Sequence, residues 1–193
     1  MKKILITLSG LALLLVPGCV VLSVYPFFTQ KDLVFETALI GNWVDADTTG
    51  TPKEEWRIEP SGRNGYLLTA VENGKTNRSD AHLFRLQKQL FLDLRPEPRE
   101  ENSDFCLPLH YVLKVTQIEP TLQLRPLAYD WLEKLIEKNP RAIRHMVYHE
   151  KAGDTNGTLI LTADTKELQK LILKYSGDTN AFKELSEMRR RKD

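Results

Sequence analysis

Histidine and cysteine pairs at short spacing are the residues of this sequence that could support chemistry. His145 and His149 lie four residues apart, so on a helix or a strand they share one face, as two metal ligands do. Cys106 and His110 have the same spacing, which would suit a nucleophile and its base. No third nitrogen or sulfur ligand accompanies the histidines in the sequence, and Pro108 separates the thiol from His110. We therefore predict no metal site, no catalytic residue and no cofactor from these pairs.

An acidic run imitates a calcium-binding loop. In Asp45-x-Asp47-x-Thr49-Gly50 the oxygen ligands stand at positions 1, 3 and 5 and glycine stands at position 6, which is how such loops begin. Position 12, which needs a bidentate Glu, holds Trp56. A hairpin turn accounts for the same residues, and we predict a turn. The sequence also lacks a Gly-x-Ser-x-Gly elbow, a phosphate-binding glycine loop and a dinucleotide fingerprint.

The first residues have the layout of an export signal. A basic pair, Lys2-Lys3, precedes an apolar stretch of 13 residues, Ile4 to Val16, as in a signal peptide. The stretch is shorter than the roughly 20 apolar residues that cross a bilayer. Residues 4–30 contain no charged side chain, so a membrane-spanning anchor and a simple secreted protein stay open as alternatives. Pro17-Gly18 would interrupt a spanning helix near its middle.

The run Val16-Pro17-Gly18-Cys19 resembles the lipobox of bacterial lipoprotein precursors, with an aliphatic residue three positions before an invariant cysteine and a small residue directly before it. The resemblance implies cleavage after Gly18, a diacylglycerol thioether on Cys19 and a further acyl chain, such as palmitate, on its new amino group. Three acyl chains exceed the one-chain anchoring that is only marginal. Val20 stands where Asp is typical of inner-membrane lipoproteins, so the resemblance implies the outer membrane, facing the periplasm, in a Gram-negative cell.

Composition argues against a dedicated nucleic-acid binder. The chain has 193 residues, with 27 basic and 26 acidic side chains and a net charge of +1. Removal of residues 1–18 takes away two lysines and leaves 193 − 18 = 175 residues, with 27 − 2 = 25 basic against 26 acidic groups. A nearly neutral body argues against nucleic acid as a partner. The length suits one domain with its own core, in which Cys106, without a cysteine partner if Cys19 is acylated, is expected as a buried apolar residue.

Alternating apolar and polar residues predict seven short strands from residue 39 onward. They are residues 39–45, 54–59, 66–71, 79–86, 89–94, 111–118 and 121–127. Turn-forming residues such as Gly62 and Asn73-Gly74 separate them, as hairpins require. Strands at spacings near ten residues predict an antiparallel meander that closes into a barrel or a sandwich.

Two to three helices are predicted after the meander, so the fold class is α+β. Apolar residues recur at helical spacing over 128–138, 164–176 and 180–193, and short strands are expected at 142–149 and 158–162. The predicted organisation has four parts. They are a signal peptide (1–18), a lipid-anchored apolar linker (19–37), a barrel-like domain with helices (38–176) and a C-terminal helix with a basic tail (177–193).

Aromatic residues mark both the linker and the first strand. Tyr25, Phe27 and Phe28 would lie either in the membrane interface or against the bottom of the domain. Gly41-Asn42-Trp43 resembles the Gly-x-Trp that begins the first strand of lipocalin-like (calycin) barrels, where the Trp closes the base of the barrel. That resemblance implies that Trp43 is the barrel-base aromatic, with Trp56 as a second barrel aromatic. More broadly, the Gly-x-Trp strand, the meander and the Leu-rich helices after it resemble exported bacterial lipoproteins, a resemblance that implies no activity.

These patterns predict a lipid-anchored protein of the cell envelope that binds an apolar ligand or another envelope component and is not an enzyme. Its membrane partner would be reached through the lipid on Cys19, and its ligand-binding residues are not identified by the sequence. Two alternatives stay open: a structural or assembly-factor lipoprotein with a packed core, and a hydrolase built from Asp, Glu and His at the barrel mouth. An open interior favours a carrier, and a packed one favours an interaction module.

Overall fold

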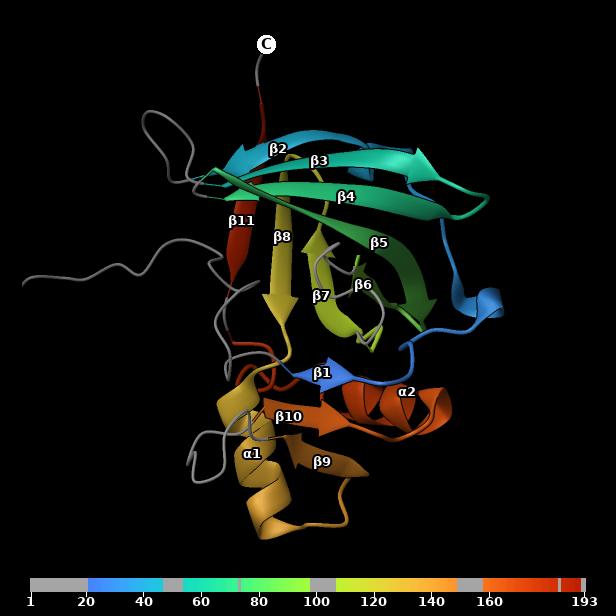
Figure 1. Cartoon of the computed structure of the whole chain (residues 1–193), viewed down its shortest axis with the longest axis vertical. Coiled ribbons are helices and arrows are strands. Elements are labelled where there is room, and N and C mark those ends of the chain that lie inside the picture. The colour runs from blue at the N-terminus through green and yellow to red at the C-terminus, as the bar shows by residue number, and fades with distance from the viewer. Residues whose placement is uncertain are drawn as a thin grey trace, which may run out of the picture.

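A closed antiparallel barrel forms the main body of the protein (Figure 1). The structure is a computed structural model and describes residues 21–46, 54–72, 74–97, 107–148, 158–183 and 185–191. Its barrel strands are β2 (Gly41–Asp45), β3 (Glu54–Ser61), β4 (Gly65–Glu72), β5 (Lys75–Leu86), β6 (Gln89–Pro96), β7 (Tyr111–Gln117), β8 (Thr121–Pro126) and β11 (Ser186–Arg190). The predicted meander that closes into a barrel, followed by helices, is confirmed.

Alternation of side chains explains why the barrel closes. In β3, Glu54, Trp56 and Ile58 are buried inside, whereas Arg57 between them is exposed, as the period of two in a strand requires. Closure leaves no strand edge without a partner. The same alternation places Phe84 of β5 on the outer wall of the barrel, where a second layer covers it.

The second layer packs on the outside of the barrel. It contains the three-stranded sheet β1 (Leu22–Ser23), β10 (Thr158–Leu161) and β9 (His145–Tyr148), with helices α1 (Tyr129–Lys138) and α2 (Thr165–Lys174). Figure 1 shows this layer below the barrel. β1 runs parallel to β10, and β9 runs antiparallel to it. Within the described ranges, no helix has the length and apolar character needed to cross a membrane.

The segment predicted as a linker over 19–37 is part of the folded body as far as it is described. Phe27 is fully buried, and its N–H donates to Asp93 Oδ2 at 2.9 Å. Phe28 stacks on His82 with ring centroids 4.7 Å apart. The prediction of a linker is therefore wrong for these residues, because their apolar side chains are more stable buried against the barrel than exposed.

The prediction of a helix and a basic tail over 177–193 is also wrong. Ser186–Arg190 forms β11, which pairs with both β2 and β8 and closes the barrel. The spacing of Phe182, Leu185 and Met188 fits a helix, but seven strands alone would leave two open edges with unpaired backbone groups. Tertiary pairing therefore outweighs the local pattern, and Met188 points into the core.

Candidate functional site

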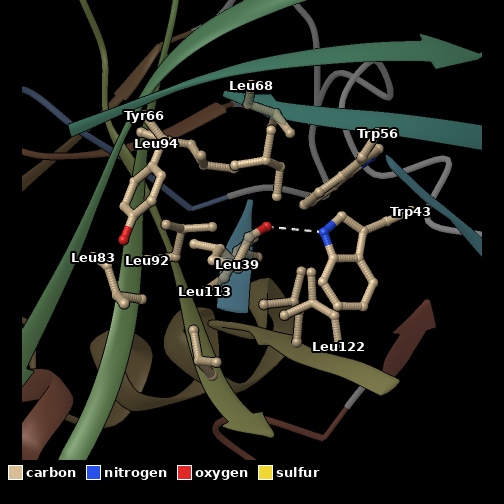
Figure 2. Packing of buried hydrophobic residues seen from close by; sticks show 14 of the residues in the cluster. Leu39, Trp43, Trp56, Tyr66, Leu68, Leu83, Leu92, Leu94, Leu113 and Leu122 are labelled. Atoms are coloured by element: carbon tan, nitrogen blue, oxygen red, sulfur yellow. Dashed lines mark hydrogen bonds between the residues drawn. The ribbon is translucent and has the colours of Figure 1, made fainter. Parts of the chain in front are cut away.

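Side chains fill the interior of the barrel (Figure 2). The largest of them are less than 2% exposed and include Trp43, Trp56, Tyr66, Leu68, Leu83, Leu92 and Leu94. Two surface pockets of about 290 and 330 Å³ lie elsewhere, one at the rim between β6 and β7 and one beside α1. The described interior is thus a packed core.

One end of the barrel is closed by the segment that precedes β2. The indole N–H of Trp43 donates to the carbonyl of Leu39 at 2.9 Å, as Figure 2 shows, and both side chains are fully buried. The backbone N–H of Glu36 donates to the hydroxyl of Tyr66 at 2.7 Å. These bonds tie residues 36–39 across the barrel end beside Trp43.

Arg190 of β11 covers Trp43 and was not identified from the sequence. Its guanidinium carbon lies 4.5 Å from the Trp43 ring centroid. Its Nη1 donates to the carbonyl of Ile40 at 2.9 Å and its Nη2 to that of Ala38 at 2.6 Å. Arg190 belongs to the predicted basic tail, and the run Arg189–Lys192 contains no indication that one member turns toward a tryptophan.

A methyl group at Gly41 would disturb this arrangement. Its Cβ would lie 2.6 Å from Arg190 Nη1, and Gly41 has a φ of +139°, which side chains disfavour. We expect Gly41→Ala to lower the free energy of unfolding by about 2 kcal/mol in urea titrations. Gly177→Ala is the control, because a methyl group there meets nothing within 4 Å. Equal unfolding midpoints for the two variants would contradict the prediction.

A carboxyl group is buried inside the barrel at the start of β3. Glu54 is 4% exposed and accepts a hydrogen bond of 2.6 Å from the indole N–H of Trp56. Burial raises the pKa of Glu54 to about 7. The bond from Trp56 opposes this shift, and the negative charges of Glu72 and Asp45 add to it. Glu54 therefore exchanges its proton near neutral pH.

Tyr111 adds a second polar group to the interior. Its side chain is buried, and within the described residues its hydroxyl has no hydrogen-bond partner. Burial raises the pKa of this hydroxyl, and the charges of Glu54 and Asp93 raise it further. Across the described segments, no group of three or more His, Cys, Asp and Glu side chains could hold a metal ion.

A cluster of titratable side chains, Asp93, His110 and His82, lies on the outer wall of the barrel, where residues 21–28 cover it. Asp93 is fully buried, and besides the N–H of Phe27 it contacts Nδ1 of His110 at 2.7 Å. His82 pairs with Asp93 across β5 and β6. Burial lowers the pKa of His82, and nearby carboxylates oppose the shift. The nearby hydroxyl of Ser23 donates to the carbonyl of Tyr25 at 2.8 Å. Among the described residues, the cluster around Asp93 therefore holds the N-terminal segment through the bond from Phe27.

A groove lies between α1 and residues 175–183. It is lined by Trp131 and Tyr175, whose rings pack edge to face with their centroids 4.7 Å apart. Lys134 and Lys138 also line it. The Trp131 N–H donates to Asp178 Oδ2 at 3.1 Å. The groove is a shallow aromatic surface with lysines around it.

Several residues named from the sequence lie outside the described ranges. They include the predicted signal peptide (1–18), Cys19 and Val20, and also Asp47, Thr49, Gly50, Cys106 and His149. His110 belongs to the Asp93 group, and Asp45 ends β2. His145 begins β9, where its Nδ1 lies 2.9 Å from the carbonyl of Ile143.

Comparisons with known proteins give no relative. No family model, curated protein or solved structure matches the chain.

Proposed function

We propose that the protein is a lipid-anchored envelope protein that acts as an interaction module, with its barrel as a rigid body. The observation that carries this proposal is the packed interior, in which Trp43, Trp56 and Tyr66 are at most 1% exposed. Drug-sized ligands need pockets of about 300–1,000 Å³, and these side chains occupy the place where a lipocalin-like carrier would hold its ligand. The packed-core alternative is therefore preferred to an apolar-ligand carrier.

The anchor of the proposal is Cys19. The lipobox-like run ends at this residue, and β1 begins three residues later at Leu22. Ser23 of β1 exchanges backbone hydrogen bonds of 2.8 Å with His110, directly before barrel strand β7. A lipid on Cys19 would therefore be attached to a short strand that is itself bonded to the body, and the barrel would be held close to the membrane.

Anchoring is tested by two matched cysteine variants. In a Gram-negative host supplied with an alkyne-tagged fatty acid, we expect wild type and Cys106→Ser to be labelled and to fractionate with membranes. Cys19→Ser should be unlabelled and should lose the lipid attachment, because it lacks the acylated thiol. A processed wild-type protein that is unlabelled and soluble would refute the anchor.

The packed interior is tested by a ligand titration. Purified protein is titrated with a fluorescent fatty acid, and bound lipid is sought by mass spectrometry of organic extracts. An interaction module should show neither saturable one-to-one binding nor a stoichiometric co-purified lipid. Either result would favour a carrier of an apolar ligand over an interaction module.

A further inference from the structure

Strand β9 exposes three successive apolar side chains. Met146 and Val147 are each 47% exposed and Tyr148 is 53% exposed. Successive side chains of a strand point to opposite faces, so both faces of this edge present apolar surface. β9 is the outer strand of its sheet, with β10 as its neighbour in that sheet.

The register of the sheet places this edge close to the expected lipid. Leu22 pairs with Ile160, and Ile160 pairs with Met146, so Met146 lies two strand spacings, or about 10 Å, from Leu22. Because β9 runs antiparallel to β10, Tyr148 lies two residues further toward the end where β1 begins. Cys19 precedes Leu22 by three residues, which span at most about 11 Å.

Tyr25 adds exposed aromatic surface beside the start of β9. Its side chain is 48% exposed. The N–H of Val24 donates to the carbonyl of Leu161 at 3.0 Å, and the N–H of Thr162 donates to that of Arg144 at 3.0 Å. These bonds extend the pairing of β1, β10 and β9 by one residue beyond the strands, and Tyr25 is the residue after Val24.

We infer that β9 and Tyr25 form a membrane-contacting face that lies in the interfacial layer of the bilayer holding the lipid on Cys19. The inference rests on the proposed anchor, because the chain reach from Cys19 keeps Met146 of this face within about 21 Å of the acylated residue. Tyrosine is at home at the membrane interface, with its ring in apolar surroundings and its hydroxyl in water. Met146 and Val147 supply apolar area that loses its contact with water there.

A second copy of the chain is the competing occupant of this edge. β9 has four residues, so pairing with another β9 would add a short ladder. Lipid contact needs no such pairing and accounts for exposure on both faces of the strand. We therefore favour the bilayer, and the experiment separates the two.

The test places a fluorophore on the face in acylated protein. Val147→Cys is labelled in a Cys106→Ser background, where the acylated Cys19 does not react, and the protein is incorporated into phosphatidylcholine–phosphatidylglycerol vesicles that contain a nitroxide lipid. The control is Arg57→Cys, an exposed position of β3 on the far side of the barrel from β9 (Figure 1). Unchanged urea midpoints verify that both variants are folded.

We expect lipid-borne nitroxide to quench the label at position 147 several-fold more than the label at position 57. Equal, weak quenching of both labels in protein that floats with the vesicles would overturn the membrane-contacting face and leave the anchor intact. Energy transfer between labels at position 147 without lipid quenching would overturn it in favour of a second copy. Acylated protein that fails to float with vesicles would overturn the anchor and the inference together.

Discussion

Trp43→Ala should lower the free energy of unfolding by about 3–5 kcal/mol, as truncation of a large buried aromatic does. Trp43 is fully buried, so the substitution leaves a cavity inside the barrel. It also removes the hydrogen bond to Leu39 and the ring on which Arg190 packs. Since small domains are stable by about 5–15 kcal/mol, this single change would remove a large part of the total.

The measurement is urea unfolding followed by circular dichroism, with Trp43→Phe as the matched variant. Phenylalanine keeps an aromatic ring under Arg190 but cannot donate to Leu39, so we expect a loss of about 1–2 kcal/mol. A loss below about 1 kcal/mol for Trp43→Ala would show that the segment over the barrel end does not depend on this residue.

Glu54→Gln should stabilise the protein at alkaline pH and change little at acidic pH. The pKa of Glu54 rises from 4.5 to about 7 on folding. Between these values the folded state holds a proton that the unfolded state has released, so stability falls as pH rises from 4.5 through 7. The full difference corresponds to about 3 kcal/mol, and glutamine removes this loss because it cannot ionise.

The experiment compares urea unfolding of Glu54→Gln and wild type at pH 4, 6 and 8. Glutamine keeps the Oε1 atom that accepts from Trp56, so the advantage of the variant should grow with pH to about 2–3 kcal/mol. Glu55→Gln is the control in the same strand, because Glu55 ion-pairs with Arg191 near the surface; its effect should stay within about 1 kcal/mol. A difference for Glu54→Gln that is independent of pH would contradict the raised pKa.

The seven strands predicted from the sequence all occur, because each is a local alternation bounded by turn residues. β3 is an example, since Trp56 and Ile58 alternate with Arg57. β1 and β11 were missed for a physical reason. Each is short, and each becomes a strand only through partners far along the chain, such as Leu161 for Ser23 and Leu122 for Met188.

Burial of polar residues was predictable only in part. Glu54 stands two residues before Trp56, so the alternation already places its carboxyl inside the barrel. Asp93 differs, because it lies on the outer wall and is buried by Phe27 and its neighbours. A covering segment of this kind leaves no periodic pattern in the strand that it covers. The contact between Arg190 and Trp43 is similar, because it forms only when β11 pairs with β2, and no pattern in either strand indicates it.

The short strand β1 has a mechanical consequence. It is bonded on one side to β10 and on the other to His110, with backbone hydrogen bonds of 2.8–3.0 Å from Ser23 and Val24. A pull from Cys19 along the strand would act across these bonds, which run from β1 sideways to its neighbours, slanted where the pairing with β10 is parallel, and would load them mainly in shear. Several bonds would then share the force at once instead of opening one after another. Force applied to the residues before β1 would thus be carried by two separate parts of the body, the barrel through His110 and the outer sheet through β10.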